Sequence, residues 1–395
     1  MVYFDIDMDQ IIYVLLMTVF VVNVQGYNLT DFQTLHTDLF TSHKKSVMPM
    51  ESQWKPLTVG IKFYLNSITS FKEVDETMSL QVSSLLIWND PSLSWNPGSY
   101  AGIDTTSVPS ENIWIPPIFV VNRVDKMEGL GSKTSFYTSI SYTGDVYYSP
   151  GDVIDITCPT DISKFPFDTQ RCVVYVLAWG TNTNTLNFTS IEANAKLDYF
   201  SPNSDWTLQE HSTNVEEWHS QSVFKVTLQV KRQPLYYTVM VVIPTLLFAV
   251  LNPLVFLLPV ESGERVGFSV TILLSYAIFL TLVSSSVPAT SNPMCVLLII
   301  MVIIIIISGI IVFGTIRISN YYHTENIEEI SSSLKRFTQW RFKGKSNVVL
   351  NVSKENEIEI TGRDIANILD SILFYGSYVV IFTISFAYIL YVIIS

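Results

Sequence analysis

Four long apolar stretches constrain this chain more than any other feature of its sequence. They cover residues 235–258, 266–287, 294–316 and 371–394. Each is long enough to cross a bilayer, which needs roughly 20 residues of helix. A buried helix of a soluble protein could imitate one of them, but the run of isoleucines at 303–307 leaves the third almost no other interpretation. We therefore predict that the second half of the chain is an all-α bundle of four transmembrane helices.

The first half shows the residue patterns of β-strands. Alternating or β-branched runs, separated by turn residues, cover residues 79–88, 135–142, 144–148, 153–157, 173–178 and 223–232. About ten such strands over roughly 200 residues fit one antiparallel, immunoglobulin-like sandwich. The predicted architecture is an all-β sandwich at residues 27–233, three transmembrane helices within 234–316, and the fourth at 371–395.

The N-terminal residues 1–26 have the pattern of a secretory signal peptide, because small residues follow a short apolar run. The aspartates before this run are atypical of such a signal. Secretion would place the sandwich outside the cell, together with the glycosylation sequons at Asn28 and Asn187. Basic residues place the short segment 317–370, which carries an amphipathic helix and the sequon at Asn351, in the cytosol. Four spans then leave both termini of the mature protein outside.

The cysteines and the charges agree with an outer domain. Cys158 and Cys172 fall within it, whereas Cys295 opens the third span. In an oxidising compartment the first two form a disulfide around a 13-residue loop, and two free thiols are the alternative. Residues 1–234 hold 25 acidic and 14 basic residues, which argues against nucleic acid or other anionic partners.

Several short motifs follow one another along the chain. They are Trp88-Asn89-Asp90, Trp95-Asn96-Pro97, Trp114-Ile115-Pro116, Tyr142-Thr143-Gly144, Phe165-Pro166-Phe167-Asp168 between the two cysteines, Pro234-Leu235-Tyr236-Tyr237, Pro244 and Gly263-Glu264-Arg265. In this order and spacing the sequence resembles subunits of the Cys-loop family of pentameric ligand-gated ion channels, along nearly its whole length. The resemblance implies a nicotinic-receptor-like subunit with an atypical agonist site.

The second span carries more hydroxyl groups than the others, which suits the wall of an aqueous pore better than lipid. One stripe at helical spacing contains Glu264, Gly267, Thr271, Leu274, Ile278, Leu282 and Ser285. Around a fivefold axis Glu264 would form a carboxylate ring at the cytosolic mouth that favours cations, as in cation-conducting relatives. Apolar rings at Leu274 and Ile278 would close the pore by dewetting. Ser285 stands where many such relatives carry an acidic residue, so conductance or calcium permeability should be reduced.

Each of these pore assignments has a plainer alternative. Leu274 and Ile278 could simply pack against neighbouring helices. Glu264 could be a solvated interfacial charge beside Arg265. The family resemblance favours the pore roles.

Gating requires a mechanical contact between the two domains, and we expect four segments to meet there. They are the acidic turn at Glu73, the loop residues Phe165, Pro166, Phe167 and Asp168, Arg232 before the first span, and Pro288 after the second. An Arg232–Glu73 pair would be partly buried and costly to break. An exposed pair that contributes less than about 1 kcal/mol is the alternative.

Relatives bind agonists between subunits in an aromatic cage, where ring faces attract an organic ammonium. The candidate ligand-binding positions are Trp179, Trp218, Trp206, Val121 and Ser83. Trp179 matches the central tryptophan of the cage, although a core position is the alternative. Val121 replaces a common tyrosine, and Ser83 falls where an aromatic residue is common on the complementary face. The short loop predicted at 211–222, near the other two tryptophans, lacks the adjacent cysteine pair of acetylcholine-binding subunits, so acetylcholine is an unexpected ligand.

These features predict a multi-pass plasma-membrane subunit of a pentamer, assembled from identical or related subunits. It would bind a small-molecule ligand of unknown identity, conduct cations and contact membrane lipid, and a postsynaptic or sensory cell membrane is one candidate setting. The alternative is a non-conducting or regulatory subunit that acts only in heteromeric assemblies, because the cage is depleted. The histidines show no metal-ligand spacing and no hydrolase motif is present, so we expect no cofactor, no metal site and no enzymatic activity.

Overall fold

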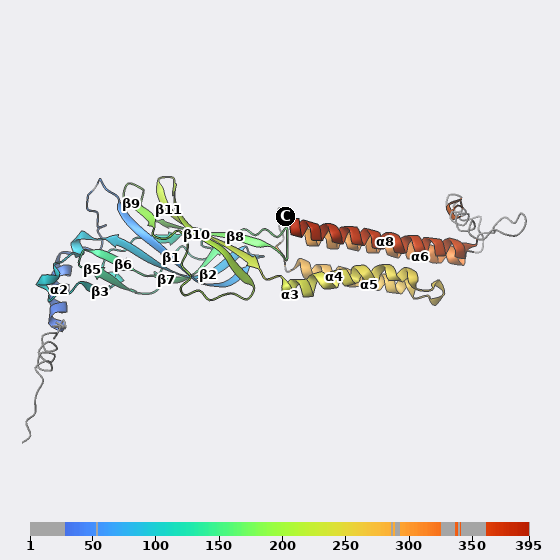
Figure 1. Cartoon of the computed structure of the whole chain (residues 1–395), viewed down its shortest axis with the longest axis horizontal. Helices are drawn as coiled ribbons and strands as arrows, with labels where there is room; N and C mark the ends of the chain where they lie inside the picture. The colour runs from blue at the N-terminus through green and yellow to red at the C-terminus, as the bar shows by residue number, and fades with distance from the viewer. Residues whose placement is uncertain are drawn as a thin grey trace, which may run out of the picture.

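In a computed structural model the chain is elongated, with a β-sandwich at one end and a bundle of helices at the other (Figure 1). The structure describes residues 28–52, 54–285, 287–288, 293–324, 336–338, 340 and 361–394. The predicted signal peptide and most of the predicted cytosolic segment, including Asn351, lie outside these residues.

The described part of the outer domain contains one helix, α2 (Leu29–Ser42), short 3-10 turns and eleven strands. The strands are β1 (Leu57–Lys72), β2 (Thr77–Asn89), β3 (Thr105–Pro109), β4 (Ile118–Val120), β5 (Tyr137–Ser141), β6 (Asp145–Tyr148), β7 (Gly151–Thr157), β8 (Thr169–Ala178), β9 (Leu186–Ser190), β10 (Trp206–Trp218) and β11 (Gln221–Arg232). The short turns are η1 (Pro91–Leu93), η2 (Pro97–Ser99) and η3 (Ser110–Asn112).

The strands form two sheets around one hydrophobic core. The first has the order β3-β5-β6-β2-β1-β9, with β7 also paired to β2, and the second has the order β10-β11-β8-β4. Side chains alternate between the core and the outer face, so that Leu80 and Leu86 of β2 are buried in the same core as Phe224 and Leu228 of β11. The predicted sandwich is confirmed, but it is not purely antiparallel, because β1 and β9 pair in parallel.

Five strands lie outside the sequence ranges given above for strands: β1, β3, β4, β9 and β10. The longest of them, β1, has a register shift between Leu65 and Ser67, which interrupts simple alternation. The predicted loop at 211–222 is instead a hairpin, because β10 runs to Trp218 and a tight turn at His219 and Ser220 leads into β11. The prediction of a loop was wrong because polar residues occupy most of the outer face of β10.

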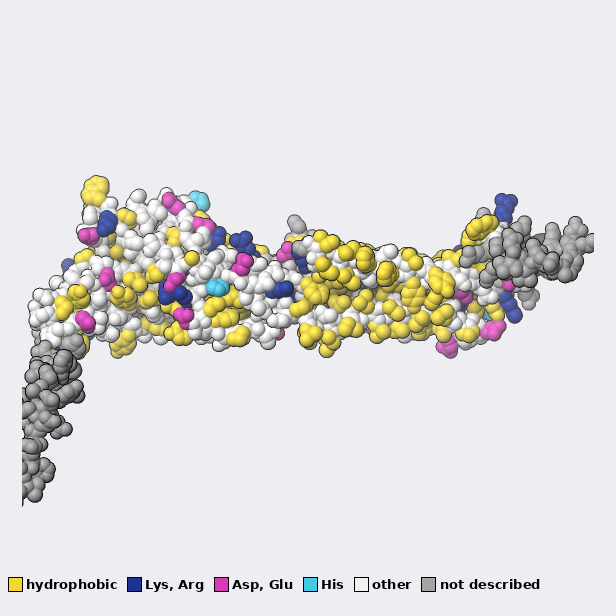
Figure 2. Space-filling model, viewed as in Figure 1, with side chains coloured by type: hydrophobic (Ala, Val, Ile, Leu, Met, Phe, Trp, Pro, Cys, Tyr) yellow, Lys and Arg dark blue, Asp and Glu magenta, His cyan; other side chains and the backbone are white. Residues whose placement is uncertain are grey.

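Four helical segments of the described chain are long and apolar enough to cross a membrane. The first combines α3 (Leu235–Tyr237), the π-helical turn η4 (Thr238–Val242), α4 (Ile243–Leu251) and the 3-10 turn η5 (Asn252–Leu257); after the turn η6 (Val260–Ser262) come α5 (Arg265–Ser284), α6 (Val296–His323) and α8 (Gly362–Ile394). Figure 2 shows apolar side chains covering this bundle, whereas charged side chains gather on the sandwich and at the far end. Helices α6 and α8 extend into the segment 317–370 that was predicted to be cytosolic.

Candidate functional site

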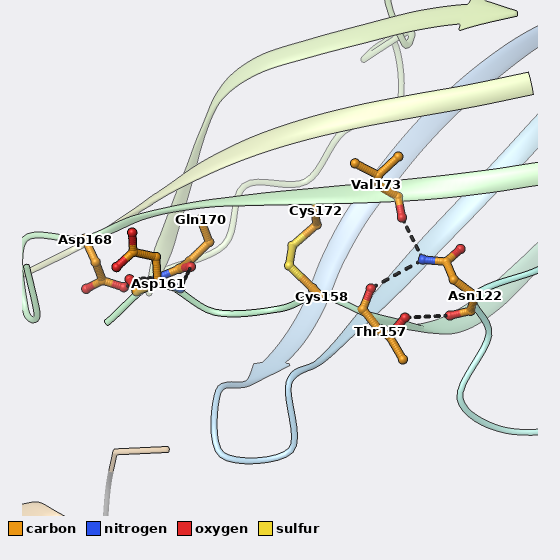
Figure 3. The surroundings of a disulfide bond; sticks show 8 residues. All are labelled: Asn122, Thr157, Cys158, Asp161, Asp168, Gln170, Cys172 and Val173. Atoms are coloured by element: carbon orange, nitrogen blue, oxygen red, sulfur yellow. Dashed lines mark hydrogen bonds between the residues drawn. A yellow bond between two sulfur atoms is a disulfide. The ribbon is translucent and has the colours of Figure 1, made fainter. Parts of the chain in front are cut away.

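A disulfide between Cys158 and Cys172 joins the two sheets (Figure 3). Cys158 directly follows β7, Cys172 lies in β8, and both are buried. Two residues before Cys172, the side chain of Gln170 donates to the backbone oxygen of Asp161 and accepts from its N–H, each at 2.8 Å. The enclosed loop therefore has a fixed shape where it leaves the sandwich.

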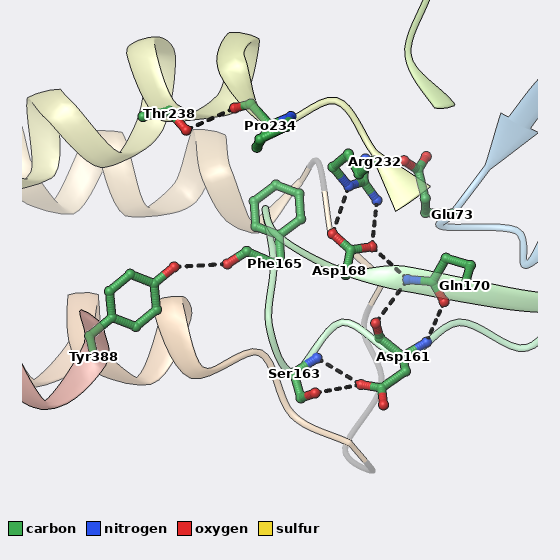
Figure 4. Close-up of polar contacts among 10 residues, drawn as sticks. All are labelled: Glu73, Asp161, Ser163, Phe165, Asp168, Gln170, Arg232, Pro234, Thr238 and Tyr388. Atoms are coloured by element: carbon green, nitrogen blue, oxygen red, sulfur yellow. Dashed lines mark hydrogen bonds and ion pairs between the residues drawn. The ribbon is translucent and has the colours of Figure 1, made fainter. Parts of the chain in front are cut away.

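Arg232, the last residue of β11, lies at the boundary between the sandwich and the bundle (Figure 4). Its Nε donates to Asp168 Oδ1 at 2.8 Å and its Nη2 to Oδ2 at 3.1 Å. A third bond joins Nη1 to Glu73 Oε1 at 2.5 Å. The Arg232 side chain is 3% exposed and that of Asp168 1%. The expected contact with Glu73 is therefore present, but Asp168 is the more deeply buried partner.

Three aromatic rings surround the Arg232 guanidinium. Its carbon lies 4.3 Å from the ring centre of Trp206, 5.1 Å from that of Phe165 and 5.2 Å from that of Tyr237. Burial disfavours the charge, but hydrogen bonds and attraction from Asp168 and Glu73 hold the pKa of Arg232 above its ordinary value. The cation is thus fixed by carboxylates and ring faces together.

The prediction that Trp206 belongs to the ligand cage is wrong. Hairpin pairing places Trp206 opposite Arg232 and Trp218 opposite Gln221, at the two ends of β10. A strand of 13 residues spans about 40 Å. The error follows from the predicted loop at 211–222, which placed both tryptophans near one short loop. In the structure the whole of β10 separates them.

The disulfide loop contacts the bundle through Phe165. Its buried ring packs edge-on against Tyr237 of α3, with ring centres 4.9 Å apart. Its backbone oxygen accepts a hydrogen bond from the Tyr388 hydroxyl of α8 at 3.0 Å (Figure 4). The loop therefore touches both the first and the last membrane helix, and Tyr388 is a contact that the sequence did not indicate.

The remaining predicted coupling residues lie around this contact. Pro166 is buried and Phe167 half-buried in the turn, and Pro288 is buried after α5. Val287, the neighbour of Pro288, packs in the same apolar cluster as Phe165. The structure thus brings three of the four expected segments into direct contact, and the segment of Pro288 adjoins them through Val287.

The predicted pore stripe is the exposed face of α5 in this single subunit. Its members Glu264, Gly267, Thr271, Leu274, Ile278, Leu282 and Ser285 are all exposed. Arg265 instead points into the bundle, where its Nη2 lies 2.8 Å from Asp370 Oδ1 of α8 and donates to Phe256 O at 2.9 Å. The two adjacent charges at the start of the helix therefore face different surroundings.

The outer face of the four-stranded sheet carries the two other candidate tryptophans, Trp179 and Trp218. Trp179 follows β8 and is 51% exposed, so it is not a core residue, and its ring lies 6.2 Å from that of Phe119. Trp218 packs against Tyr175, with ring centres 4.7 Å apart. The N–H of Val121 donates to Tyr175 O at 2.8 Å, so Val121 lies beside the rings and adds none.

Ser83 lies apart from this face, in β2 of the other sheet. Its hydroxyl donates to Asn66 Oδ1 at 3.3 Å. Within one subunit it therefore does not meet Trp179. It would have to approach a ligand from a neighbouring copy.

Sequence reasoning missed three residues of the outer face: Tyr175, Glu216 and Lys225. Lys225 Nζ lies 2.9 Å from Glu216 Oε1, and hydrogen bonding to this ammonium holds the pKa of Glu216 below its usual range. Alternation along β8 and β11 could have identified Tyr175 and Lys225 as outward-facing. Their placement on one face with Glu216 could not be predicted, because it depends on the register of the β10–β11 hairpin.

Comparisons with known proteins agree with this architecture. Residues 32–234 match the neurotransmitter-gated ion-channel ligand binding domain, and residues 241–388 match the neurotransmitter-gated ion-channel transmembrane region. The chain is 31% identical over 291 residues to the acetylcholine receptor subunit alpha-type unc-38 of Caenorhabditis elegans, covering 66% of this chain and 57% of the relative. It is 31% identical over 254 residues to the neuronal acetylcholine receptor subunit beta-2 of Carassius auratus, covering 63% and 54%. The chain thus spans a little over half the length of these relatives.

Proposed function

The chain belongs to the neurotransmitter-gated ion-channel family, and from this premise we propose that it is a nicotinic-type subunit of a pentameric, cation-selective channel in the plasma membrane. The family is one of channels and not of enzymes. Residues 27–233 would form the extracellular domain, and residues 234–316 and 371–395 would cross the membrane. The short segment between them would be cytosolic, and both termini of the mature protein extracellular.

The observation that carries this proposal is the exposed stripe of α5. Side chains such as Thr271, Leu274 and Ile278 are exposed in the single subunit, as expected for residues that line a channel between five copies. Glu264 precedes the helix at the end remote from the sandwich, and Arg265 points away from it toward Asp370. The Glu264 carboxylates would therefore remain available to attract cations, while the apolar rings close the pore.

The ligand would bind at subunit interfaces, on the outer face that carries Trp179 and Trp218. β11 runs from this face to Arg232, so a shift of the hairpin would reach Asp168 and the loop that contacts α3 and α8. This continuous path supports coupling between ligand and pore. The relatives reported above are named as acetylcholine receptor subunits, but Val121 and Ser83 supply no rings to a cage, so acetylcholine is not the ligand that we propose.

A second candidate function is a regulatory subunit that assembles only with related subunits. The observation that favours it is the same pair of missing rings, at Val121 and Ser83. Such a subunit would contribute its α5 to a mixed pore without supplying a complete ligand site.

The pore assignment can be tested without knowing the ligand. A Leu274→Thr variant, expressed alone in oocytes, should conduct without agonist because a hydroxyl at the apolar constriction favours wetting. Its reversal potential should follow sodium and not chloride. Adding Glu264→Gln should reduce that cation preference, whereas the matched control Glu261→Gln, which alters an exposed carboxylate bonded to Tyr322, should not.

Three results would count against the proposal in different ways. A current that follows chloride would overturn the role of Glu264 in cation selection. Equal effects of Glu264→Gln and Glu261→Gln on the reversal potential would also overturn that role. Silence of the Leu274→Thr variant, despite subunit at the cell surface, would favour the regulatory subunit.

A further inference from the structure

The outer face of β10, β11 and β8 carries one ion pair set among aromatic rings. Lys225 of β11 is paired with Asn214 of β10 and with Tyr175 of β8. Because directly paired residues of neighbouring strands point to the same face, the three side chains lie side by side on the outside of the sheet. Glu216, two residues beyond Asn214, points to that face as well.

The Glu216 carboxylate is held by three donors. Its Oε1 accepts from Lys225 Nζ and from Asn214 Nδ2, each at 2.9 Å. Its Oε2 accepts from Trp218 Nε1 at 3.3 Å. The carboxylate is therefore fixed in place and fixes Trp218 in turn, over the ring of Tyr175.

The Lys225 ammonium keeps unused binding capacity. A lysine has three N–H donors, and among the described residues Lys225 donates to Glu216 alone. Its side chain is 22% exposed, so it is accessible from the face. Two donors with a full positive charge are therefore available to an acceptor from outside.

This resident cation changes which ligand the face can accept. A quaternary ammonium could lie against the aromatic rings and Glu216, but it would leave the two free donors of Lys225 without an acceptor. A ligand that carries both charges uses both parts of the ion pair, because its carboxylate can bind the Lys225 ammonium and its own ammonium can lie against ring faces and Glu216.

We infer that the face formed by Lys225, Glu216, Tyr175, Trp218 and Trp179 binds a small zwitterion of the amino-acid class. Its carboxylate binds the free N–H donors of Lys225. Its ammonium lies between Glu216 and the tryptophan rings. This inference rests on the proposed function, since it assigns the ligand class of the same interface.

The test compares three compounds of similar shape on the full-length protein reconstituted in lipid nanodiscs. γ-Aminobutyrate carries both charges, 4-aminobutanamide only the ammonium, and butyrate only the carboxylate; glycine and β-alanine extend the series to shorter zwitterions. Binding is measured by tryptophan fluorescence, with the Trp218→Phe variant as the reference. We expect a zwitterion to bind at least about tenfold more tightly than the amide or butyrate, because the charge-assisted bond to Lys225 is lost in one case and the ammonium contacts in the other.

Substitutions at Lys225 separate charge from structure. Lys225→Met should lower the affinity for the zwitterion about tenfold or more and leave that for the amide unchanged or improved. Lys225→Arg, which keeps the charge and the donors, should retain most of the affinity. Lys231→Met is the matched control, because Lys231 is exposed on the same face of β11, at the end remote from the rings.

The inference is overturned if the amide binds as tightly as the zwitterions, if Lys225→Met leaves their affinity unchanged, or if no zwitterion binds at millimolar concentration. Binding is measured here without current. A channel that conducts through the Leu274→Thr pore but ignores zwitterions would refute this inference alone. Zwitterion binding without any current would instead refute the proposed channel.

Discussion

The Arg232 guanidinium and the Asp168 carboxylate form a doubly hydrogen-bonded pair in which both side chains are almost wholly buried. The pair joins the end of β11, which leads into the first span, to the disulfide loop that contacts α8 through Phe165. Loss of Asp168 would leave Arg232 with Glu73 as its only carboxylate partner among the described residues, and loss of Arg232 would leave the Asp168 carboxylate without compensation in a desolvated site. This junction therefore contributes to stability and connects the two domains.

Asp168→Asn should destabilise the subunit more than Glu73→Gln. The first change leaves Arg232 without its buried partner, for which we expect a loss of about 3–5 kcal/mol. The second removes a single bond to a side chain that is 19% exposed, and its effect should be smaller. The thermal midpoint of the detergent-solubilised protein and its yield at the cell surface are the measurements. Equal losses for both variants would contradict the dominance of Asp168.

Tyr388→Phe should loosen the contact between α8 and the disulfide loop. It removes the hydrogen bond to Phe165 O and leaves that oxygen without this donor, for which we expect about 1 kcal/mol. In the Leu274→Thr background the spontaneous current should change as the loop loses its anchor. Tyr391→Phe, three residues further along the same helix, is the control and should alter neither the thermal midpoint nor the current. An unchanged current in both variants would show that α8 does not participate in gating through this bond.

The helices and the disulfide loop could be predicted because their signals are local. Long apolar runs identify the spans, and the paired cysteines with their motif identify the loop. The partners of charged residues could not be predicted in the same way. Arg265 is adjacent to Glu264 in sequence, yet it pairs with Asp370 of the last helix, which no local pattern indicates. Trp206 was misplaced for a related reason, since only the register of the β10–β11 hairpin shows that it belongs beside Arg232.

Two substitutions that both remove the sequon at Asn28 should differ in their effect on stability. Asn28 caps α2 by accepting from Asp31 N–H at 2.9 Å, and Asp31 accepts from Asn28 N–H in return. Thr30→Ala should abolish a glycan at Asn28 and leave the cap, seen as a mobility shift with little change in stability. Asn28→Ala should remove the glycan and the cap together and cost about 1 kcal/mol more. If Thr30→Ala produces no mobility shift, the sequon is not used.

The Glu216–Lys225 pair should be lost at a lower pH than the one at which an ordinary glutamate is protonated. Hydrogen bonding to Lys225 lowers the pKa of Glu216 in the folded protein, so the pair is complete above the ordinary glutamate range and is lost only as the pH falls through the lowered pKa. Because Trp218 donates to the same carboxylate, its fluorescence reports the change when the signal of Trp218→Phe is subtracted. Lys225→Met removes the main cause of the shift, so the midpoint of the acid transition should move to higher pH. Lys231→Met should leave it in place. A midpoint that is the same in all three proteins would show that Lys225 does not control the charge of Glu216, and would remove the electrostatic basis for a zwitterion at this face.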